Sequence, residues 1–226
     1  MWPFLGLAAL VPAFPASAQI GASVSVLSDE LYRGHSLSEH RAAAVLSLSY
    51  DDAGGAYGGL SLTAVPGEAL SHVEYAGYVR RLTLAGPALD LGISDAQVTS
   101  YKAPRRRVEY QELYAGLVGD ELSFHLHYSP NYFDAGAPTL YADLDGAIRP
   151  APQWRLFAHL GALTPLGGPV APGSRKERYD LSAGVARKFT RAEVSLTWST
   201  TGPVTRRPDG VRQDRDTVAL GASYFF

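Results

Sequence analysis

The last ten residues, 217–226, alternate between larger apolar and mostly small side chains. The apolar positions are Val218, Leu220, Ala222, Tyr224 and Phe226. A period of two places alternate residues on opposite faces of a β-strand. Ten residues also match the roughly 9–11 that a tilted strand needs to cross a bilayer. The pattern predicts a terminal strand, lying either in a membrane barrel or docked in a soluble sheet.

The same alternation recurs from residue 19 onward and predicts twelve short strands separated by turn residues. The predicted strands are 20–26, 42–50, 60–64, 73–80, 89–94, 108–118, 122–129, 140–148, 155–162, 181–185, 193–198 and 217–226. The alternation is sharpest in 122–129. The register of 108–118 is left open, because Gln111 interrupts one candidate apolar face and Glu112 interrupts the other.

The connections alternate in length. Those after even-numbered strands are short and comprise 51–56, 83–88, 119–121, 149–153 and 189–191. Those after odd-numbered strands include the long polar segments 165–178 and 202–216. Bacterial outer-membrane barrels have an even strand number, short periplasmic turns and longer outer loops. The sequence therefore predicts an all-β fold, a closed antiparallel up-and-down transmembrane β-barrel of about twelve strands.

Residues 1–18 have the features of a secretory signal peptide, which leaves 19–226 as the barrel domain. An apolar stretch at 4–11 precedes the small residues Ala16-Ser17-Ala18, the pattern of a cleavage site. The segment contains no Lys or Arg, so either the amino terminus alone supplies the positive charge or the true start lies upstream of Met1. We expect cleavage near Ala18 and export.

Composition narrows the function classes. No apolar run of eighteen residues occurs after the signal segment, which argues against membrane-spanning helices. The chain has no cysteine, so disulfides and thiol chemistry are excluded. A formal net charge of −2 gives no reason to expect nucleic-acid binding, and we expect no cofactor.

Charged and histidine side chains in the predicted strands are candidates for lining the lumen, because the inner face of such barrels is polar. They are Glu74, Arg80, Asp90, His125, His127, Asp143, Asp145, Arg155, His159 and Glu193. In strand 73–80 the apolar positions Val73, Tyr75 and Val79 are taken to face lipid, which assigns Glu74 and Arg80 to the lumen.

A second group of candidates is basic and predicted to lie in loops. It comprises Arg33, Arg105, Arg106, Arg107, Arg206 and Arg207. Guanidinium groups suit the phosphates of lipopolysaccharide, and charges in a pore bias which solutes pass. Solvated surface charge is the third interpretation. The sequence does not choose among the three.

His127 and Ser129 lie two residues apart, on one strand face, and a nucleophilic serine needs its base within hydrogen-bond reach. An outer-membrane lipid hydrolase is therefore a minor alternative, and no catalytic residue is assigned. His125 and His127 share a face as well. Two histidines without a third ligand nearby are poor evidence for a metal site, so none is assigned.

The chain resembles the TorF family of porins, a proteobacterial outer-membrane group. The matching segments are Ser28-Asp29, Tyr32-Arg33-Gly34-His35-Ser36-Leu37-Ser38, Tyr114-Ala115-Gly116, Tyr128-Ser129-Pro130-Asn131-Tyr132-Phe133 and the terminal Phe226. The resemblance implies an outer-membrane barrel that acts as a porin. It carries over no binding residues.

We expect an outer-membrane porin that allows passive diffusion of small hydrophilic solutes. The alternative is a closed structural or adhesive barrel, in which the loop 165–178 folds inward. The expected partners are outer-membrane lipid, lipopolysaccharide, small solutes, and the barrel-assembly machinery, which would recognise the C-terminal strand ending at Phe226.

Deleting Phe226 should impair assembly more than stability. One aromatic ring at a membrane interface contributes about 1–2 kcal/mol at most, whereas the end of the last strand is what an assembly receptor could recognise. We expect a large fall in membrane yield and a small shift of the denaturant midpoint of refolded protein. An unchanged yield would remove the assembly role.

Overall fold

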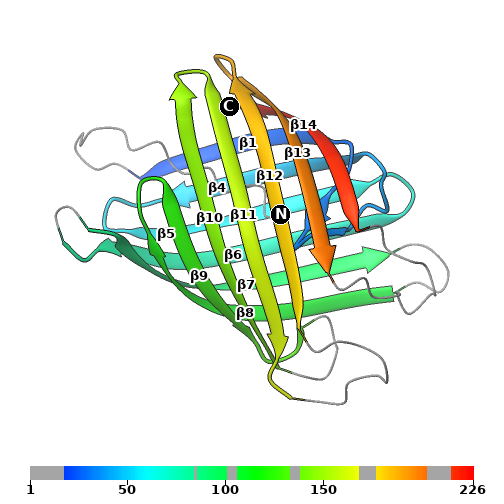
Figure 1. Cartoon of the computed structure of the whole chain (residues 1–226), viewed down its shortest axis with the longest axis horizontal. Helices are drawn as coiled ribbons and strands as arrows, with labels where there is room; N and C mark the ends of the chain where they lie inside the picture. Colours follow the sequence, from blue (N-terminus) through cyan, green and yellow to red (C-terminus); the bar gives the residue numbers. More distant parts are fainter. Residues whose placement is uncertain (1–17, 84–85, 101–105, 133–137, 168–176, 203–214) are drawn as a thin grey trace.

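The computed structural model describes residues 18–83, 86–100, 106–132, 138–167, 177–202 and 215–226. Within these residues, twelve strands form a closed antiparallel barrel in which each strand pairs with its neighbours in the sequence (Figure 1). The barrel strands are β1 (Gln19–Leu27), β4 (Ala43–Asp51), β5 (Ala56–Val65), β6 (Ala69–Arg81), β7 (Ala88–Ser100), β8 (Arg106–Val118), β9 (Leu122–Ser129), β10 (Thr139–Ala151), β11 (Trp154–Pro165), β12 (Arg178–Lys188), β13 (Ala192–Gly202) and β14 (Asp216–Phe225). The predicted fold class and strand number are confirmed.

The barrel closes where its first and last strands pair. Five residue pairs join β1 to β14, from Ser23 opposite Phe225 to Leu27 opposite Gly221. The amide of Phe226 continues the seam by donating to the carbonyl of Ala22 at 3.1 Å. No helix among the described residues is long and apolar enough to span a membrane.

The outer face of the barrel is apolar and the inner face is polar. On β13, for example, Leu196 and Trp198 are 48% and 41% exposed, whereas Thr197 between them is 2% exposed. Cross-strand partners share a face, and Leu196 lies opposite Val185 and Leu220, both apolar. A soluble sheet would bury these side chains. Exposed apolar side chains outside and polar side chains inside are expected of a barrel surrounded by lipid.

The face assignment of β6 differs from the sequence prediction. Val73 points inward and packs against a cluster of buried side chains, and the ring of Tyr75 lies 6.2 Å from that of Tyr57. Glu74 and Arg80 therefore lie on the exposed outer face. The prediction that these two line the lumen is wrong, because apolar side chains on this strand have a partner inside the barrel.

The outer surface of β6–β8 is polar near the end that carries the long loops. Glu74 lies opposite Asp95, and the Gln111 amide donates to Asp95 at 2.7 Å. This pairing also settles the register of β8, in which Gln111 faces outward and Glu112 faces inward. On β7 the outward-facing side chains are apolar up to Ile93, and the next outward-facing side chain, Asp95, is polar.

A substitution pair on β13 tests this assignment of faces. Leu196→Arg should cost about 2–4 kcal/mol if the residue lies near the bilayer midplane, whereas Ser195→Arg on the inner face should cost much less. The measurement is the free energy of unfolding from liposomes. Equal losses for the two variants would contradict the assigned faces.

Candidate functional site: the barrel interior

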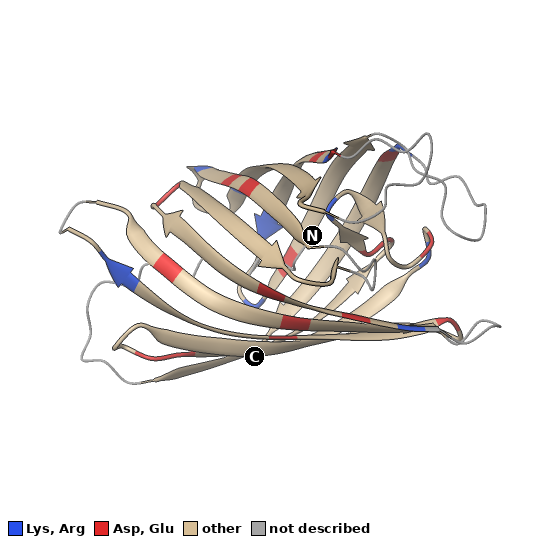
Figure 2. Cartoon of the chain, turned by 90° about the horizontal axis from the view of Figure 1, so that it is seen from below, with Lys and Arg blue, Asp and Glu red and all other residues tan. Residues whose placement is uncertain are grey.

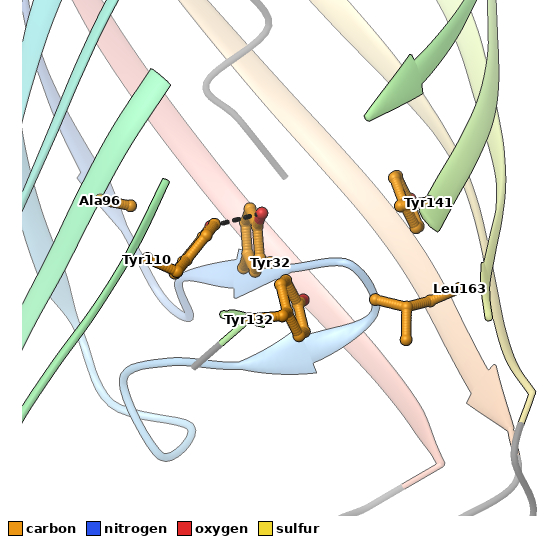
Figure 3. Close-up of a cluster of buried hydrophobic side chains, with 6 residues drawn as sticks. All are labelled: Tyr32, Ala96, Tyr110, Tyr132, Tyr141 and Leu163. Carbon is orange, nitrogen blue, oxygen red and sulfur yellow. Dashed lines mark hydrogen bonds between the residues drawn. The ribbon is translucent and has the colours of Figure 1, made fainter. Parts of the chain in front are cut away.

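The loop between β1 and β4, residues 28–42, folds into the barrel as a small hairpin of β2 (Leu31–Tyr32) and β3 (His35–Ser36) (Figure 3). Its organising side chain is Asp29, 4% exposed, whose Oδ1 accepts hydrogen bonds from the hydroxyls of Ser36 and Ser38 at 2.5 and 2.8 Å. The Ser38 hydroxyl accepts in turn from the amide of Glu30 at 2.9 Å. The hairpin therefore holds its own shape. We call residues 28–42 the luminal hairpin.

The tip of the luminal hairpin crosses the lumen to the far wall. Its two turn residues have positive φ, 46° at Arg33 and 74° at Gly34, as tight two-residue hairpin turns require. A Cβ atom at position 34 would lie 2.8 Å from the Cβ atoms of Asp180 on β12 and Thr201 on β13. A side chain at position 34 would therefore require the tip to shift away from this wall.

Arg33 is buried at the centre of the barrel. Its Nη1 and Nη2 donate to Oε1 and Oε2 of Glu112 on β8, both at 2.9 Å. Arg33 is 7% exposed and Glu112 2%. Bidentate pairs of this kind are among the stronger hydrogen-bonded contacts in proteins. Removing one partner of a buried pair leaves an uncompensated charge, which is costly.

Three tyrosine rings surround the guanidinium. Its Cζ lies 3.8 Å from the ring centroid of Tyr141 on β10, 5.0 Å from Tyr32 and 5.3 Å from Tyr132. Cations are attracted to the faces of aromatic rings at such distances, more strongly where water is excluded. Glu112, Tyr132 and Tyr141 belong to the barrel wall and its loops, and together we call them the guanidinium cage.

Aromatic side chains pack around the tip of the luminal hairpin inside the lumen. The Tyr110 hydroxyl donates to that of Tyr32 at 2.5 Å, and the Tyr110 and Tyr132 rings lie 5.1 Å apart. Figure 3 shows Tyr32 and Tyr132 between the two walls, which contribute Tyr110 and Tyr141. The cavity beside Arg33 measures about 10 Å³, roughly the space of one water.

A chain of histidines, aspartates and tyrosines continues along the wall from β5 to β12. Acidic residues recur along the barrel strands, not only at their ends (Figure 2). The contacts are Tyr57 Oη to Asp90 Oδ1 at 2.5 Å, Asp90 Oδ2 to His125 Nε2 at 3.1 Å, His125 Nδ1 to Asp143 Oδ1 at 3.7 Å, and Asp143 Oδ2 to His127 Nε2 at 2.9 Å. Beyond it, His159 bridges Asp145 at 2.8 Å and Asp180 at 2.9 Å.

The wall formed by the other strands carries hydroxyl groups. Ser25 and Ser223 share a hydrogen bond across β1 and β14 at 2.8 Å, and Ser47 and Ser61 share one across β4 and β5 at 3.3 Å. The interior therefore has a charged, aromatic side and a hydroxyl-lined side. Both suit hydrophilic contents.

The structure places eight of the ten candidate lumen residues on the inner face. They are Asp90, His125, His127, Asp143, Asp145, Arg155, His159 and Glu193. Arg155 pairs with Glu193 at 2.6 Å. Glu74 and Arg80 lie outside, as described above.

The six basic loop candidates do not form one patch in the described part of the chain. Arg33 is buried in the barrel, and Arg107 is exposed and pairs with Glu109 at 2.9 Å. Arg105, Arg206, Arg207 and the side chain of Arg106 lie outside the described residues, as does most of the loop 165–178 that the closed-barrel alternative invoked.

Sequence reasoning missed Glu112, Tyr141, Asp180 and the inward path of Arg33. Tyr141 could have been found, because it shares the polar strand face of Asp143. Glu112 depended on a register that the sequence left open. Arg33 was assigned to a loop, and no local pattern distinguishes an outward loop from one that folds inward.

The contacts do not support a serine nucleophile at Ser129. Its side chain is fully buried, and its hydroxyl has no hydrogen-bond partner among the described residues. His127 faces Asp143 at 2.9 Å and Glu112 at 3.6 Å. Within the described residues, no group of three or more His, Asp or Glu side chains is arranged to hold a metal ion.

Comparison with known proteins places this architecture among porin-like barrels. The model of the Gcw_chp family, described as a bacterial protein of unknown function, matches residues 13–220. No match was found among curated proteins. A KdgM porin in complex with disordered oligogalacturonate is 11% identical, with 93% of this chain and 99% of that chain covered and a TM-score of 0.56. A NanC porin is 9% identical, with 91% and 99% covered and a TM-score of 0.56. These identities establish likeness of fold alone.

The docking of the luminal hairpin should depend on pH through Glu30, which is 7% exposed. Burial raises the pKa of its carboxyl from 4.5 to about 7, with a smaller contribution from Asp29 in the same direction. The docked hairpin therefore binds this proton more tightly than the undocked one. Its stabilisation is complete below about pH 4.5 and is lost as the pH rises through 7, a change of about 3 kcal/mol at most.

Hydrogen exchange of the amides in 28–42 measures this dependence. Protection should fall between pH 4.5 and 7 after correction for the intrinsic exchange rate. Glu30→Gln should remove most of the change, while the contact between His40 and Asp29 remains in both proteins. The same pH profile in both proteins would show that Glu30 is not the titrating group.

Proposed function

The chain belongs to the Gcw_chp family, and we propose that it is an outer-membrane pore through which small hydrophilic solutes diffuse passively. The observation that carries the proposal is the closed barrel with an apolar outer face and a charged, hydroxyl-rich interior. A barrel of this kind provides a polar path across a lipid layer. The resemblance to TorF-family porins supports the same assignment.

The location follows from the same features. We propose that residues 1–18 are removed near Ala18 during export and that the barrel inserts in the outer membrane. The assembly machinery would recognise the C-terminal strand, and exposed arginines such as Arg107 would contact lipopolysaccharide phosphates. A metal, cofactor or catalytic residue has no part in this proposal.

The luminal hairpin is the constriction of the proposed pore. Its tip reaches β8, β10, β12 and β13 and leaves about 10 Å³ beside Arg33. A hydrated solute does not fit in this pocket. We propose that permeation requires the hairpin to move, with the hydrogen bonds between Arg33 and Glu112 opposing that movement.

A closed structural barrel is the second candidate, and the same filled interior favours it. The two candidates differ in what happens when the luminal hairpin is removed. In a pore, a continuous polar path remains beneath it. In a structural barrel, the side chains of the opposite walls meet without it.

Planar-bilayer recording separates the two candidates. The full-length protein should show discrete conductance steps of low amplitude. A variant in which residues 30–40 are replaced by a Gly/Ser linker of equal length should show steps several times larger, because the constriction is gone. Heat-modifiable gel mobility provides the control for folding. A folded variant without conductance would favour the structural barrel.

A further inference from the structure

We propose that the guanidinium cage is a binding subsite for flat organic cations, and that Arg33 occupies it as a tethered ligand. The ligand class is a solute carrying a guanidinium or amidinium group. The role of such solutes as cargo rests on the proposed function, whereas the binding itself does not.

Each contact of the cage suits a guanidinium. The two carboxylate oxygens of Glu112 each accept from one terminal nitrogen at 2.9 Å, a fork geometry that an ammonium group cannot reproduce. The Tyr141 ring lies 3.8 Å from the cation on one side, and the Tyr132 ring lies 5.3 Å away. The side chain of Glu112 is 1% exposed, so the carboxylate is shielded from water while Arg33 is bound.

The cage and its occupant belong to separable parts of the molecule. Glu112 and Tyr141 stand on barrel strands whose ladders continue on both sides, β8 between β7 and β9 and β10 between β9 and β11. Arg33 stands at the tip of a hairpin that is attached to the barrel at its two ends. The cage can therefore persist when the hairpin leaves, and an empty cage would present a buried carboxylate without its cation.

Two features indicate that Arg33 is held under strain. Its φ of 46° lies in the left-handed region, which costs a non-glycine residue free energy. Its Nε is buried and has no hydrogen-bond partner among the described residues, which also costs free energy. A free solute in the cage would not carry the backbone penalty, so it can compete with the tethered arginine.

The wall near the cage would attract cations. Four aspartates line it, and three histidines contact them. The aspartates are Asp90, Asp143, Asp145 and Asp180, and the histidines are His125, His127 and His159. Arg178 also lines the pocket beside Arg33, and with it the four carboxylates leave this wall negative unless all three histidines are charged. Acidic linings favour cations in pores. The acidic saccharide named with the KdgM structure would be repelled from such a wall.

The direct test uses Arg33→Gly, which removes the guanidinium and leaves a residue that adopts positive φ without strain. Methylguanidinium is titrated into the detergent-solubilised, folded variant by calorimetry. We expect saturable binding in the millimolar range, and binding at least ten-fold weaker to the unaltered protein, whose cage is occupied. Urea, which has the shape without the charge, and sodium, which has the charge without the shape, should not bind. Adding Glu112→Gln to Arg33→Gly should abolish the binding of methylguanidinium.

Arg33→Lys serves as the second variant if Arg33→Gly does not fold. Lysine keeps the positive charge but cannot form the two parallel hydrogen bonds that Arg33 donates to Glu112. Methylguanidinium should therefore bind this variant more tightly than it binds the unaltered protein. Absence of saturable binding to a folded Arg33→Gly or Arg33→Lys variant would overturn the subsite. Binding that survives Glu112→Gln would overturn it as well.

Conductance distinguishes failure of the subsite from failure of the pore. If methylguanidinium binds and increases the open time of the unaltered protein, both proposals are supported. If it binds to a barrel that never conducts, the subsite stands and the pore is refuted. If the barrel conducts but no variant binds methylguanidinium, the pore stands and Arg33 is only a structural contact.

Discussion

The rest of the structure depends on closure of the barrel between β1 and β14. Lipid offers no hydrogen-bond partner to backbone groups, so a sheet that spans it cannot leave an open edge. The seam pairs Ser23 through Leu27 with Phe225 through Gly221, and the amide of Phe226 donates to the carbonyl of Ala22 at 3.1 Å. Closure fixes which face of every strand is inside, and so which side chains can meet across the lumen.

The closed barrel brings together charges that the sequence keeps far apart. Arg33 and Glu112 are separated by 79 residues, yet they form a bidentate pair. Because a buried charge is costly without its partner, the docked hairpin requires both Arg33 and Glu112. The tyrosines around it fill the remaining space and make the docked state compact. The interior is thus polar, and the hairpin and these tyrosines pack together within it.

Strands 122–129 and 217–226 could be predicted because the two-residue period reports directly on which face is apolar. The period failed on β6, where Val73 and Tyr75 are apolar and yet point inward, because the luminal hairpin and Tyr57 offer them partners. It also left β8 undecided between Gln111 and Glu112. Arg33 could not be placed for a different reason, because its position depends on side chains far along the chain, such as Glu112, which lies 79 residues later. Local pattern shows the wall of a barrel, but not what folds into it.

The central claim is that the luminal hairpin closes the barrel. A reversible disulfide bond between the hairpin and the barrel wall tests this claim most directly. The chain has no native cysteine, so Gly34→Cys with Thr201→Cys introduces the only two thiols. These positions adjoin across the lumen, since a Cβ at 34 would lie 2.8 Å from that of Thr201, and a small shift of the tip gives the separation that a disulfide needs. The measurement is single-channel conductance before and after reduction, with bond formation checked by thiol titration. We predict a barrel that stays shut while oxidised and conducts after reduction. Equal conductance in the two states would contradict the claim.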